Sequence, residues 1–249
     1  MARIRIDLLL VQRGLCPTRA KAQARIMAGD VLVADRPVTK AGALVPEDAV
    51  LRLRGEGLPF VSRGGLKLDH ALTAFHLDPA GWTCFDAGAS TGGFTDCLLQ
   101  RGAVRVYAVD VGTNQLDWHL RSDPRVVSME QVNLRYWDPA RVPEPCRLLV
   151  ADLSFISLRL VIPPLIPSLA PGADAVLLVK PQFEAGRDEV GSGGIVRDPE
   201  THRRVQREIW DFFQATALKP LGLCESPILG GEGNKEFLMH LRLETAFMG

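Results

Sequence analysis

The sequence has little of what marks several classes of protein. Its five cysteines are scattered, odd in number and without a Cys-x-x-Cys pair, so reduced thiols are expected rather than a disulfide framework or a zinc site. Apolar runs such as 175–179 are strand-sized, far short of the roughly 20 residues that a membrane-spanning helix needs. No signal peptide is recognised, because Asp7 and Arg13 interrupt the apolar stretch near the N-terminus. A cytoplasmic protein is therefore expected.

The chain also lacks an excess of charge of either sign, since 29 Lys and Arg balance 29 Asp and Glu. A uniform balance would argue against a dedicated nucleic-acid binder, because phosphate recognition usually requires an excess of basic side chains. The balance is instead an average of two unequal parts. Residues 1–67 hold 12 basic and 6 acidic side chains, a net charge of +6, whereas residues 68–249 hold 17 and 23, a net charge of −6. This asymmetry predicts a basic module joined to an acidic catalytic or binding domain.

A small α+β domain is predicted over residues 1–60. The bulk composition, 47% hydrophobic and 23% charged, is that of a globular protein. The local signals are helical spacing of apolar residues from Ile6, a stop at Gly14, a Thr18 N-cap for a helix over 19–28, and strand patterns at 31–33, 37–38 and 50–53. Four glycines and a proline within 55–65 mark the boundary with a second domain, residues 61–249.

The second domain alternates between strand and helix patterns. Strands are predicted at 83–86, 104–109, 126–129, 148–151, 175–179, 221–225 and 237–243. Helices are predicted between them, at 66–75, 93–101, 115–121, 158–169 and 203–217. This alternation favours parallel pairing with helices on both faces, whereas the last two strands, joined without a helix, should pair antiparallel. The predicted fold is α/β: a seven-stranded mixed sheet with its last strand antiparallel, as in the Rossmann-like S-adenosylmethionine-dependent methyltransferases.

A glycine-rich turn follows the first of these strands, in the segment Phe85-Asp86-Ala-Gly88-Ala-Ser90-Thr91-Gly92-Gly93-Phe94. Glycines allow close approach of a ligand to the backbone, and a helix that begins there offers free N–H groups. Ser90 replaces the second glycine of the dinucleotide fingerprint. That departure weighs against a dehydrogenase and favours S-adenosylmethionine, which has a ribose and an adenine but no pyrophosphate. The alternative is a tight turn with a capping aspartate.

Two residues beyond the following strands complete the predicted nucleoside site. Asp110 lies 24 residues after Asp86, at the end of the second strand, where its carboxylate can accept hydrogen bonds from both ribose hydroxyls. Asn133 is either an adenine contact or a turn residue. The predicted cofactor-binding residues are Asp86, Gly88, Ser90, Thr91, Gly92, Gly93, Phe94, Asp110, Asn133 and Asp152.

Four charged residues, Lys67, Asp152, Lys180 and Glu236, lie at the ends of predicted elements on the edge where chemistry is expected. Lys180 follows five apolar residues, and an ammonium group is costly to bury without a carboxylate partner. Taken singly, each residue is better explained by a structural ion pair. The combined set beside a nucleoside pocket favours catalysis.

This set resembles the catalytic tetrad of the ribose 2′-O-methyltransferases of the FtsJ/RrmJ type. The resemblance implies that Lys180 contacts the ribose 2′-hydroxyl and accepts its proton, while Asp152, Lys67 and Glu236 hold the amine in place. Methyl transfer from a sulfonium is an in-line displacement, so no metal is expected. An Asn/Asp-Pro-Pro-Tyr motif for methylation of a base amine is absent from the sequence. No cysteine follows a proline at the end of a mid-sheet strand, as the route to carbon-5 of pyrimidines would require.

The N-terminal segment 5–33 resembles the S4-like RNA-binding domain. The resemblance implies a basic surface for RNA phosphates, to which six residues are assigned: Arg5, Arg13, Arg19, Lys21, Arg25 and Arg63. Arg19 and Lys21 do not share a helical stripe by spacing alone, so the preceding turn must supply part of that face. A solvated basic helix is the alternative.

Both domains together resemble the TlyA, or haemolysin A, family, on the stretches 62–68, 86–95, 179–184 and 193–198. The resemblance implies 2′-O-methylation of cytidine in 23S ribosomal RNA, in some members also in 16S, with ribosomal RNA or subunits as partners and no membrane. The alternatives are a non-catalytic RNA-binding assembly factor and a membrane-lytic haemolysin. The intact tetrad argues against the first, and the lack of an apolar span argues against the second. The glycine-rich segment 186–198 is either a mobile lid or a surface loop without function.

Overall fold

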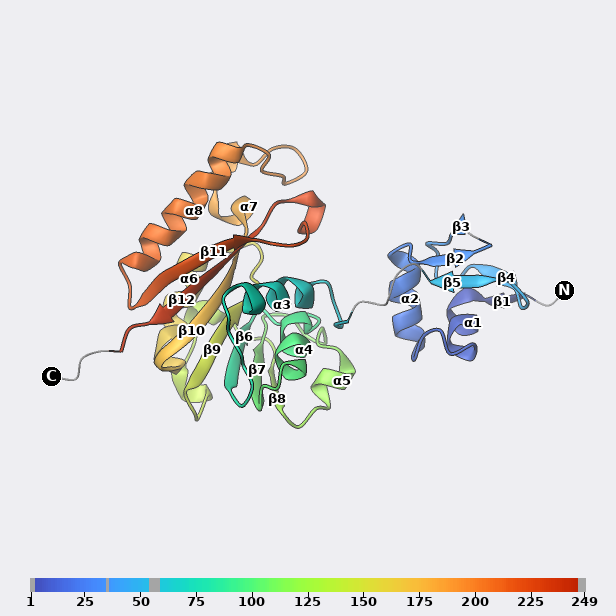
Figure 1. Cartoon of the computed structure of the whole chain (residues 1–249), viewed down its shortest axis with the longest axis horizontal. Helices are drawn as coiled ribbons and strands as arrows, with labels where there is room; N and C mark the ends of the chain where they lie inside the picture. Colours follow the sequence, from blue (N-terminus) through green and yellow to red (C-terminus); the bar gives the residue numbers. More distant parts are fainter. Residues whose placement is uncertain (1–2, 35, 54–58, 246–249) are drawn as a thin grey trace. The chain divides into compact units, whose positions relative to one another are not determined.

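The computed structural model describes residues 3–34, 36–53 and 59–245. The chain divides into two compact units, 1–59 and 60–249, and each is described by itself (Figure 1). In the described part of both units, no helix is long and apolar enough to cross a membrane. The five cysteine thiols are free, as predicted, and all except Cys224 are buried.

The first unit is a small α+β fold with two short sheets. Its elements are β1 (Arg3–Arg5), α1 (Ile6–Gln12), α2 (Arg19–Met27), β2 (Val31–Val33), β3 (Arg36–Pro37), β4 (Leu44–Pro46) and β5 (Leu51–Leu53). β1 pairs with β4, and β2 lies between β3 and β5, all antiparallel. The predicted Thr18 cap is confirmed, since its hydroxyl accepts the Lys21 N–H at 3.2 Å. β1 and β4 were not predicted, because three residues are too few to show a period of two.

Asp7, in the first turn of α1, is a fully buried carboxylate. It accepts hydrogen bonds from the Arg5 guanidinium at 2.9 and 3.0 Å, from Arg19 Nε at 2.9 Å and from the Gln23 amide at 2.8 Å. The Arg5 hydrogen bond is the main reason why the pKa of Asp7 lies well below its usual range. A buried carboxylate needs such partners, so two predicted RNA-binding arginines also stabilise the fold.

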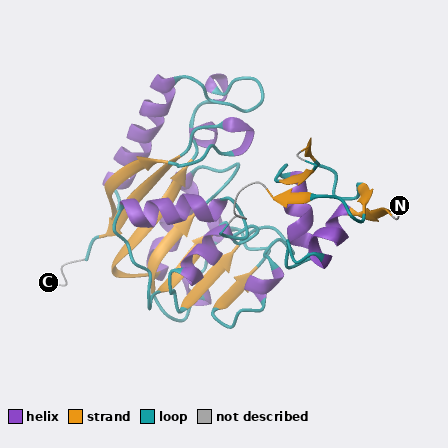
Figure 2. Cartoon of the chain, turned by 45° about the vertical axis from the view of Figure 1, so that its right-hand side comes forward, coloured by secondary structure: helices purple, strands orange, loops and turns teal. Residues whose placement is uncertain are grey.

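The second unit is a sheet flanked by helices (Figure 2). Its elements are α3 (Gly64–Ala74), β6 (Thr83–Ala87), α4 (Gly93–Gln100), β7 (Arg105–Val109), α5 (Trp118–Arg121), β8 (Val126–Met129), β9 (Cys146–Ala151), α6 (Leu158–Leu165), β10 (Leu169–Val179), α7 (Pro181–Glu184), α8 (Pro199–Gln214), β11 (Leu218–Glu225) and β12 (Phe237–Leu243). The strand order is β11-β12-β10-β9-β6-β7-β8. Pairing is parallel from β8 to β10, and β12 runs antiparallel to both neighbours. The predicted seven-stranded fold with a reversed last strand is confirmed.

Several predicted helix boundaries were wrong, and the helix predicted over 115–121 begins only at Trp118. The helix predicted over 158–169 ends at Leu165, and Leu169 already opens β10, because three prolines in 163–167 interrupt regular helix. The helix predicted from Arg203 begins at Pro199 instead. Asp198 caps it, accepting the N–H groups of Glu200 and Thr201 at 3.2 and 3.0 Å.

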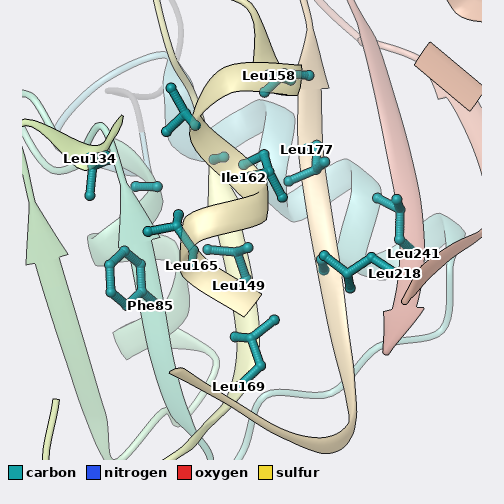
Figure 3. Packing of buried hydrophobic residues seen from close by; sticks show 14 of the residues in the cluster. Phe85, Leu134, Leu149, Leu158, Ile162, Leu165, Leu169, Leu177, Leu218 and Leu241 are labelled. Atoms are coloured by element: carbon teal, nitrogen blue, oxygen red, sulfur yellow. The ribbon is translucent and has the colours of Figure 1, made fainter. Parts of the chain in front are cut away.

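The sheet is buried on both faces, which is why its central strands read as continuous apolar runs. Successive residues of one strand enter different clusters: Leu149 and Leu177 pack with α6 and α8, whereas Leu148 and Val176 pack with α3 and α4. Figure 3 shows the first cluster, with Ile162 of α6 lying against the strands. This double layer fixes the sheet rigidly beneath its carboxyl edge.

The chain reverses direction across the sheet at one place. After β6 it continues outward to β7 and β8, then crosses back to add β9 on the other side of β6. The loops that leave β6 and β9 therefore diverge to opposite faces and leave a crevice between them, where open α/β sheets bind ligands. The predicted site residues Gly88 and Asp152 begin these two loops.

Candidate active site at the carboxyl edge of the sheet

Two cavities open side by side at this crevice, with volumes of about 280 and 520 Å³. Gly88, Ser90, Asp152 and Ser154 line both of them. Because they share these residues, the two cavities adjoin each other. The smaller is named the acceptor cavity and the larger the nucleoside cavity.

The glycine-rich turn forms the wall between the two cavities. Gly88 has a φ of +83°, and a Cβ there would lie 2.6 Å from the Asp152 carbonyl oxygen, so only glycine fits. A Cβ at Gly93 would lie 2.2 Å from the Ser62 hydroxyl oxygen, because the N-terminal ends of α3 and α4 pack closely. Ser90 adopts a left-handed φ of +48° at the position of the missing glycine. The turn thus presents backbone rather than side chains to a ligand.

Asp110 and Asn133 line the nucleoside cavity, as expected for contacts to a ribose and a base. The Asp110 carboxylate is held by the backbone N–H groups of Ser90 at 2.8 Å and Gly112 at 2.7 Å. Each carboxylate oxygen retains a second lone pair for a hydroxyl. The Asn133 side-chain oxygen accepts the Arg135 N–H at 3.1 Å, which is a turn-capping role and leaves its NH₂ group for a ligand.

The four predicted catalytic residues form two ion pairs. Lys180 Nζ lies 2.7 Å from Asp152 Oδ1, and Lys67 Nζ lies 2.5 Å from Glu236 Oε2. Lys67, Asp152 and Lys180 line the acceptor cavity, and Glu236, only 2% exposed, holds Lys67 from behind. Each nearly buried ammonium therefore has a carboxylate partner, as buried charges require.

Gly230 makes the position of Glu236 possible. A Cβ at Gly230 would lie 1.9 Å from Glu236 Oε1, so the carboxylate occupies the space that any side chain would fill. Gly230 lines the acceptor cavity together with Leu229 and Gly231. This loop between β11 and β12 therefore supports Glu236 and forms a wall of the cavity.

Asp86 reaches neither cavity. It is completely buried behind the glycine-rich turn, where Oδ2 accepts the Thr95 hydroxyl at 2.6 Å and Oδ1 has no hydrogen-bond partner. Burial raises the pKa of Asp86 to about 7, and the nearby Asp152 and Asp110 add to the rise, while the Thr95 hydrogen bond opposes it. Gly92 also faces inward, since its Cβ would meet Leu120.

Two aromatic rings lie close to each other near Lys180, and one of them, Phe155, lines the nucleoside cavity. Phe155 is 90% exposed and has a left-handed φ of +64°, a conformation that bulky residues rarely adopt. Its ring centroid lies 4.9 Å from that of Phe183, and Lys180 Nζ lies 5.8 Å from the Phe183 centroid. An exposed ring of this kind offers a flat apolar surface on which a nucleobase can stack.

The glycine-rich segment 186–198 is held in place near its C-terminal end, at Gly194 and Val196. The Val196 N–H donates to the Asn234 side-chain oxygen at 3.0 Å, and the Val196 carbonyl oxygen lies 2.9 Å from His202 Nε2. The Asn234 amide also donates to the Gly194 carbonyl at 2.9 Å. These contacts tie the segment to the loop that carries Glu236. Its action as a lid stays a prediction.

The structure thus brings together most of the predicted cofactor and catalytic residues, with Asp86 and Gly92 buried behind them. Thr91, Gly93 and Phe94 line the acceptor cavity, as does Arg63, which also donates to the Leu229 carbonyl at 2.7 Å. The sequence interpretation overlooked Ser154, Phe155 and Gly230. Ser154 and Phe155 directly follow Asp152-Leu153, so their distance from a predicted strand end was an available signal.

The predicted RNA-binding residues of the first unit differ in their surroundings. Arg13 donates to the carbonyl oxygens of Ala49 at 2.7 Å and Glu47 at 2.5 Å, and Arg5 and Arg19 pair with Asp7. Arg25 also has partners within the chain. Lys21 is exposed on α2. Among the residues that the structure describes, no three His, Cys, Asp or Glu side chains are close enough together to hold a metal ion.

Family models match both units of the chain. The FtsJ-like methyltransferase model matches residues 60–243, and the S4 domain model matches residues 4–51. This chain belongs to the TlyA family of FtsJ-like methyltransferases. It is 44% identical over 98% of its length to the 16S/23S rRNA (cytidine-2′-O)-methyltransferase TlyA of Mycobacterium tuberculosis, of which it covers 91%. It is 37% identical over 95% of its length to Hemolysin A of Brachyspira hyodysenteriae, of which it covers 99%.

Solved structures agree with this membership. A hemolysin-named protein of Streptococcus thermophilus superimposes with a TM-score of 0.78 at 46% identity, over 98% of this chain and 90% of that one. An S-adenosylmethionine-dependent methyltransferase fold from Listeria monocytogenes has a TM-score of 0.55 at 16% identity, over 74% of this chain and all of that one. The second likeness concerns the fold alone. This TlyA-family chain is therefore an enzyme of the methyltransferase class.

Asp86 is predicted to make stability depend on pH. Between about pH 4 and pH 7 the folded enzyme holds a proton on Asp86 that the unfolded chain has lost, so its free energy of unfolding falls as the pH rises through this window. The Asp86→Asn variant cannot titrate. Its free energy of unfolding relative to wild type should rise between pH 5 and pH 8, by on the order of 3 kcal/mol at most. Urea unfolding at both pH values measures this, and a pH-independent difference would contradict it.

Gly230 is predicted to be essential for the Lys67–Glu236 pair. The Gly230→Ala variant pushes the Glu236 carboxylate away from Lys67 and should lower the methyl-transfer rate by about tenfold or more, by analogy with other losses of positioned groups. The matched control is Gly231→Ala, because a Cβ there meets nothing within 4 Å. Its rate should stay near that of wild type. Equal rates for the two variants would show that the close contact is unimportant.

Proposed function

We propose that this enzyme transfers the methyl group of S-adenosylmethionine to the ribose 2′-hydroxyl of a cytidine in ribosomal RNA. The observation that carries the proposal is the Lys180–Asp152 pair, 2.7 Å apart, at the junction of the nucleoside and acceptor cavities. Lys67 and Glu236 complete the set of four charged residues. A hydroxyl is a weak nucleophile at neutral pH, and a nearby amine is the group that can take its proton.

The residues around the nucleoside cavity fit S-adenosylmethionine. Asp110 retains acceptor capacity for ribose hydroxyls, and Gly88 leaves backbone exposed where a Cβ would collide with the Asp152 carbonyl. Asp110 and Asp152 also supply carboxylates for a ligand that carries positive charge. When bound, this cofactor supplies an electrophilic methyl group on a sulfonium.

The chain's own residues prepare the acceptor. Lys180 faces the acceptor cavity, where its amine accepts the hydroxyl proton as the oxygen attacks. Asp152 holds Lys180 in place through a charge-assisted hydrogen bond, and Glu236 fixes Lys67 beside the same cavity. Phe155 stacks on the base of the acceptor nucleotide, so the ribose edge points inward toward Lys180. No metal takes part in these steps.

The choice of substrate rests on the relatives and on the basic N-terminal unit. The Mycobacterium tuberculosis relative is named for cytidine 2′-O-methylation of 16S and 23S rRNA, and the Campylobacter jejuni relative, 34% identical over 81% of this chain, is named for 23S alone. The S4 domain brings the basic side chains that bind RNA phosphates. We propose 23S rRNA in ribosomal subunits as the substrate, with 16S as a further target. The enzyme then acts in the cytoplasm, where ribosomes are.

Removal of the Lys180 amine tests the proposed reaction. Wild-type enzyme, tritiated S-adenosylmethionine and undermethylated ribosomal subunits should give label at a cytidine ribose. The Lys180→Ala variant should lose at least about 100-fold in rate, the usual contribution of a positioned base, while cofactor affinity by calorimetry stays within a few-fold. If the wild-type enzyme transferred no tritium label to the RNA, the proposal would be contradicted. Tight RNA binding without turnover would instead support a non-catalytic assembly factor.

The S4 domain gives a prediction that separates RNA contacts from fold contacts. Lys21 is exposed, so Lys21→Ala should weaken RNA binding and reduce the slope of log affinity against log salt by about one, without changing thermal unfolding. Arg19→Ala also removes a partner of buried Asp7 and should lower the unfolding temperature of the chain as well. Filter binding at several salt concentrations and calorimetry measure both quantities. An unchanged salt slope in Lys21→Ala would exclude this lysine from the RNA surface.

A further inference from the structure

The geometry points to Ser154 as a positioning residue that aims the amine of Lys180 at the acceptor hydroxyl. Ser154 lies outside the set of four charged residues and outside the glycine-rich turn. It lines both the acceptor and the nucleoside cavity, so it stands where the two reactants meet. The inference rests on the proposed methyl transfer to a ribose hydroxyl.

Three groups surround the Lys180 amine. Asp152 Oδ1 lies 2.7 Å from Nζ, the Ser154 hydroxyl oxygen accepts from it at 2.9 Å, and the Phe183 ring centroid lies 5.8 Å away. Asp152 and Ser154 both belong to the loop that follows β9, whereas Lys180 directly follows β10. One short loop of the neighbouring strand therefore supplies both hydrogen-bond acceptors.

The number of hydrogens on the amine decides what this arrangement does. To act as the base, Lys180 must enter this step as a neutral amine, after the ammonium of the ion pair has released a proton to solvent. A neutral amine has two N–H groups and one lone pair, arranged tetrahedrally around nitrogen. Asp152 and Ser154 accept one N–H each, so both are used and the lone pair is left for a third direction. Lys180 lines the acceptor cavity, and we infer that the lone pair is directed there. Without Ser154 the amine would be held at one point only and could rotate about its Cε–Nζ bond.

This orientation matters at the moment of proton transfer. As the ribose oxygen bonds to the methyl carbon, the carbon–sulfur bond breaks and its electron pair leaves with sulfur. The O–H bond of the hydroxyl breaks as well, and its proton becomes the third N–H of Lys180. A base accepts a proton efficiently only along its lone pair, so a misdirected amine slows this step without changing how tightly either reactant binds.

The backbone holds Ser154 in this place. The next residue, Phe155, has the left-handed φ of +64°, and this turn sends its ring outward while the Ser154 hydroxyl meets Lys180. Two residues further on, Ser157 caps α6 and donates to Glu184 at 2.6 Å. The loop is thus anchored at Asp152 and at Ser157, on both sides of Ser154.

Replacement of the hydroxyl tests the role of Ser154. Single-turnover methyl transfer to undermethylated subunits is measured against pH for wild type, Ser154→Ala and Ser154→Thr. In Ser154→Ala we expect the plateau rate to fall about tenfold, with water as a less directed acceptor of the second N–H. The acid limb of the profile should move to lower pH, because a hydroxyl oxygen binds a charged ammonium more strongly than a neutral amine. Ser154→Thr keeps a hydroxyl and should recover most of the rate.

Binding and stability serve as controls. Cofactor affinity by calorimetry and the Michaelis constant for RNA should stay within about twofold of wild type, since Ser154 acts through Lys180. Ser157→Ala, which removes a structural hydroxyl from the same loop, should lower the unfolding temperature and leave the acid limb in place. An unchanged plateau and acid limb in Ser154→Ala would overturn the inference and leave the proposed function intact. Equal losses in the Ala and Thr variants, with lower unfolding temperatures, would also overturn it. No transfer by wild type would overturn both.

Discussion

The need to neutralise two nearly buried lysines controls the architecture of the active site. Lys67 belongs to α3 and Lys180 directly follows β10, and each meets a carboxylate from another element. An ammonium buried without such a partner would be costly, so these pairs hold α3, β9, β10 and the start of β12 in one arrangement. The same pairs put amines beside the acceptor cavity. Structure and chemistry therefore depend on the same charges.

The carboxyl edge of the sheet also requires glycines at which other groups can come close to the backbone. The Glu236 carboxylate fills the space beside Gly230, and the Asp152 carbonyl fills the space beside Gly88. In both cases a residue of one of these ion pairs occupies the space that a side chain would otherwise fill. Gly88 and Gly230 thus leave room for the charged residues of the site, because a side chain at either position would collide with Asp152 or Glu236.

The sequence predicted the fold and most of the site because both follow from local patterns. All seven strands of the sheet and the residues at their ends were recognisable, since a buried parallel sheet has apolar strands and polar residues where they end. The role of Gly230 was not, because it depends on a contact with Glu236 that only the folded chain creates. Ser154 lies close to a predicted strand end, but its hydrogen bond with Lys180 also appears only in the folded chain. For Asp86 the sequence pattern predicted a contact that the folded chain does not make. A motif marked it as a ligand contact, yet its side chain is fully buried behind the turn.

The N-terminal unit shows how a net charge can mislead when it is counted from sequence. Arg5 and Arg19 contribute to the basic excess, but Asp7 accepts hydrogen bonds from both, and Arg13 is held by backbone carbonyls. The guanidinium groups of Arg5 and Arg19 remain roughly half exposed, so they can still face a phosphate while they stabilise the fold. In the proposed complex with RNA, such residues would both bind RNA and stabilise the fold, and a charge count cannot separate these two roles. Substitution of an exposed lysine such as Lys21 should change RNA binding alone. The salt dependence of RNA binding should therefore be easier to interpret for lysine variants than for arginine variants, which also change the stability of the fold.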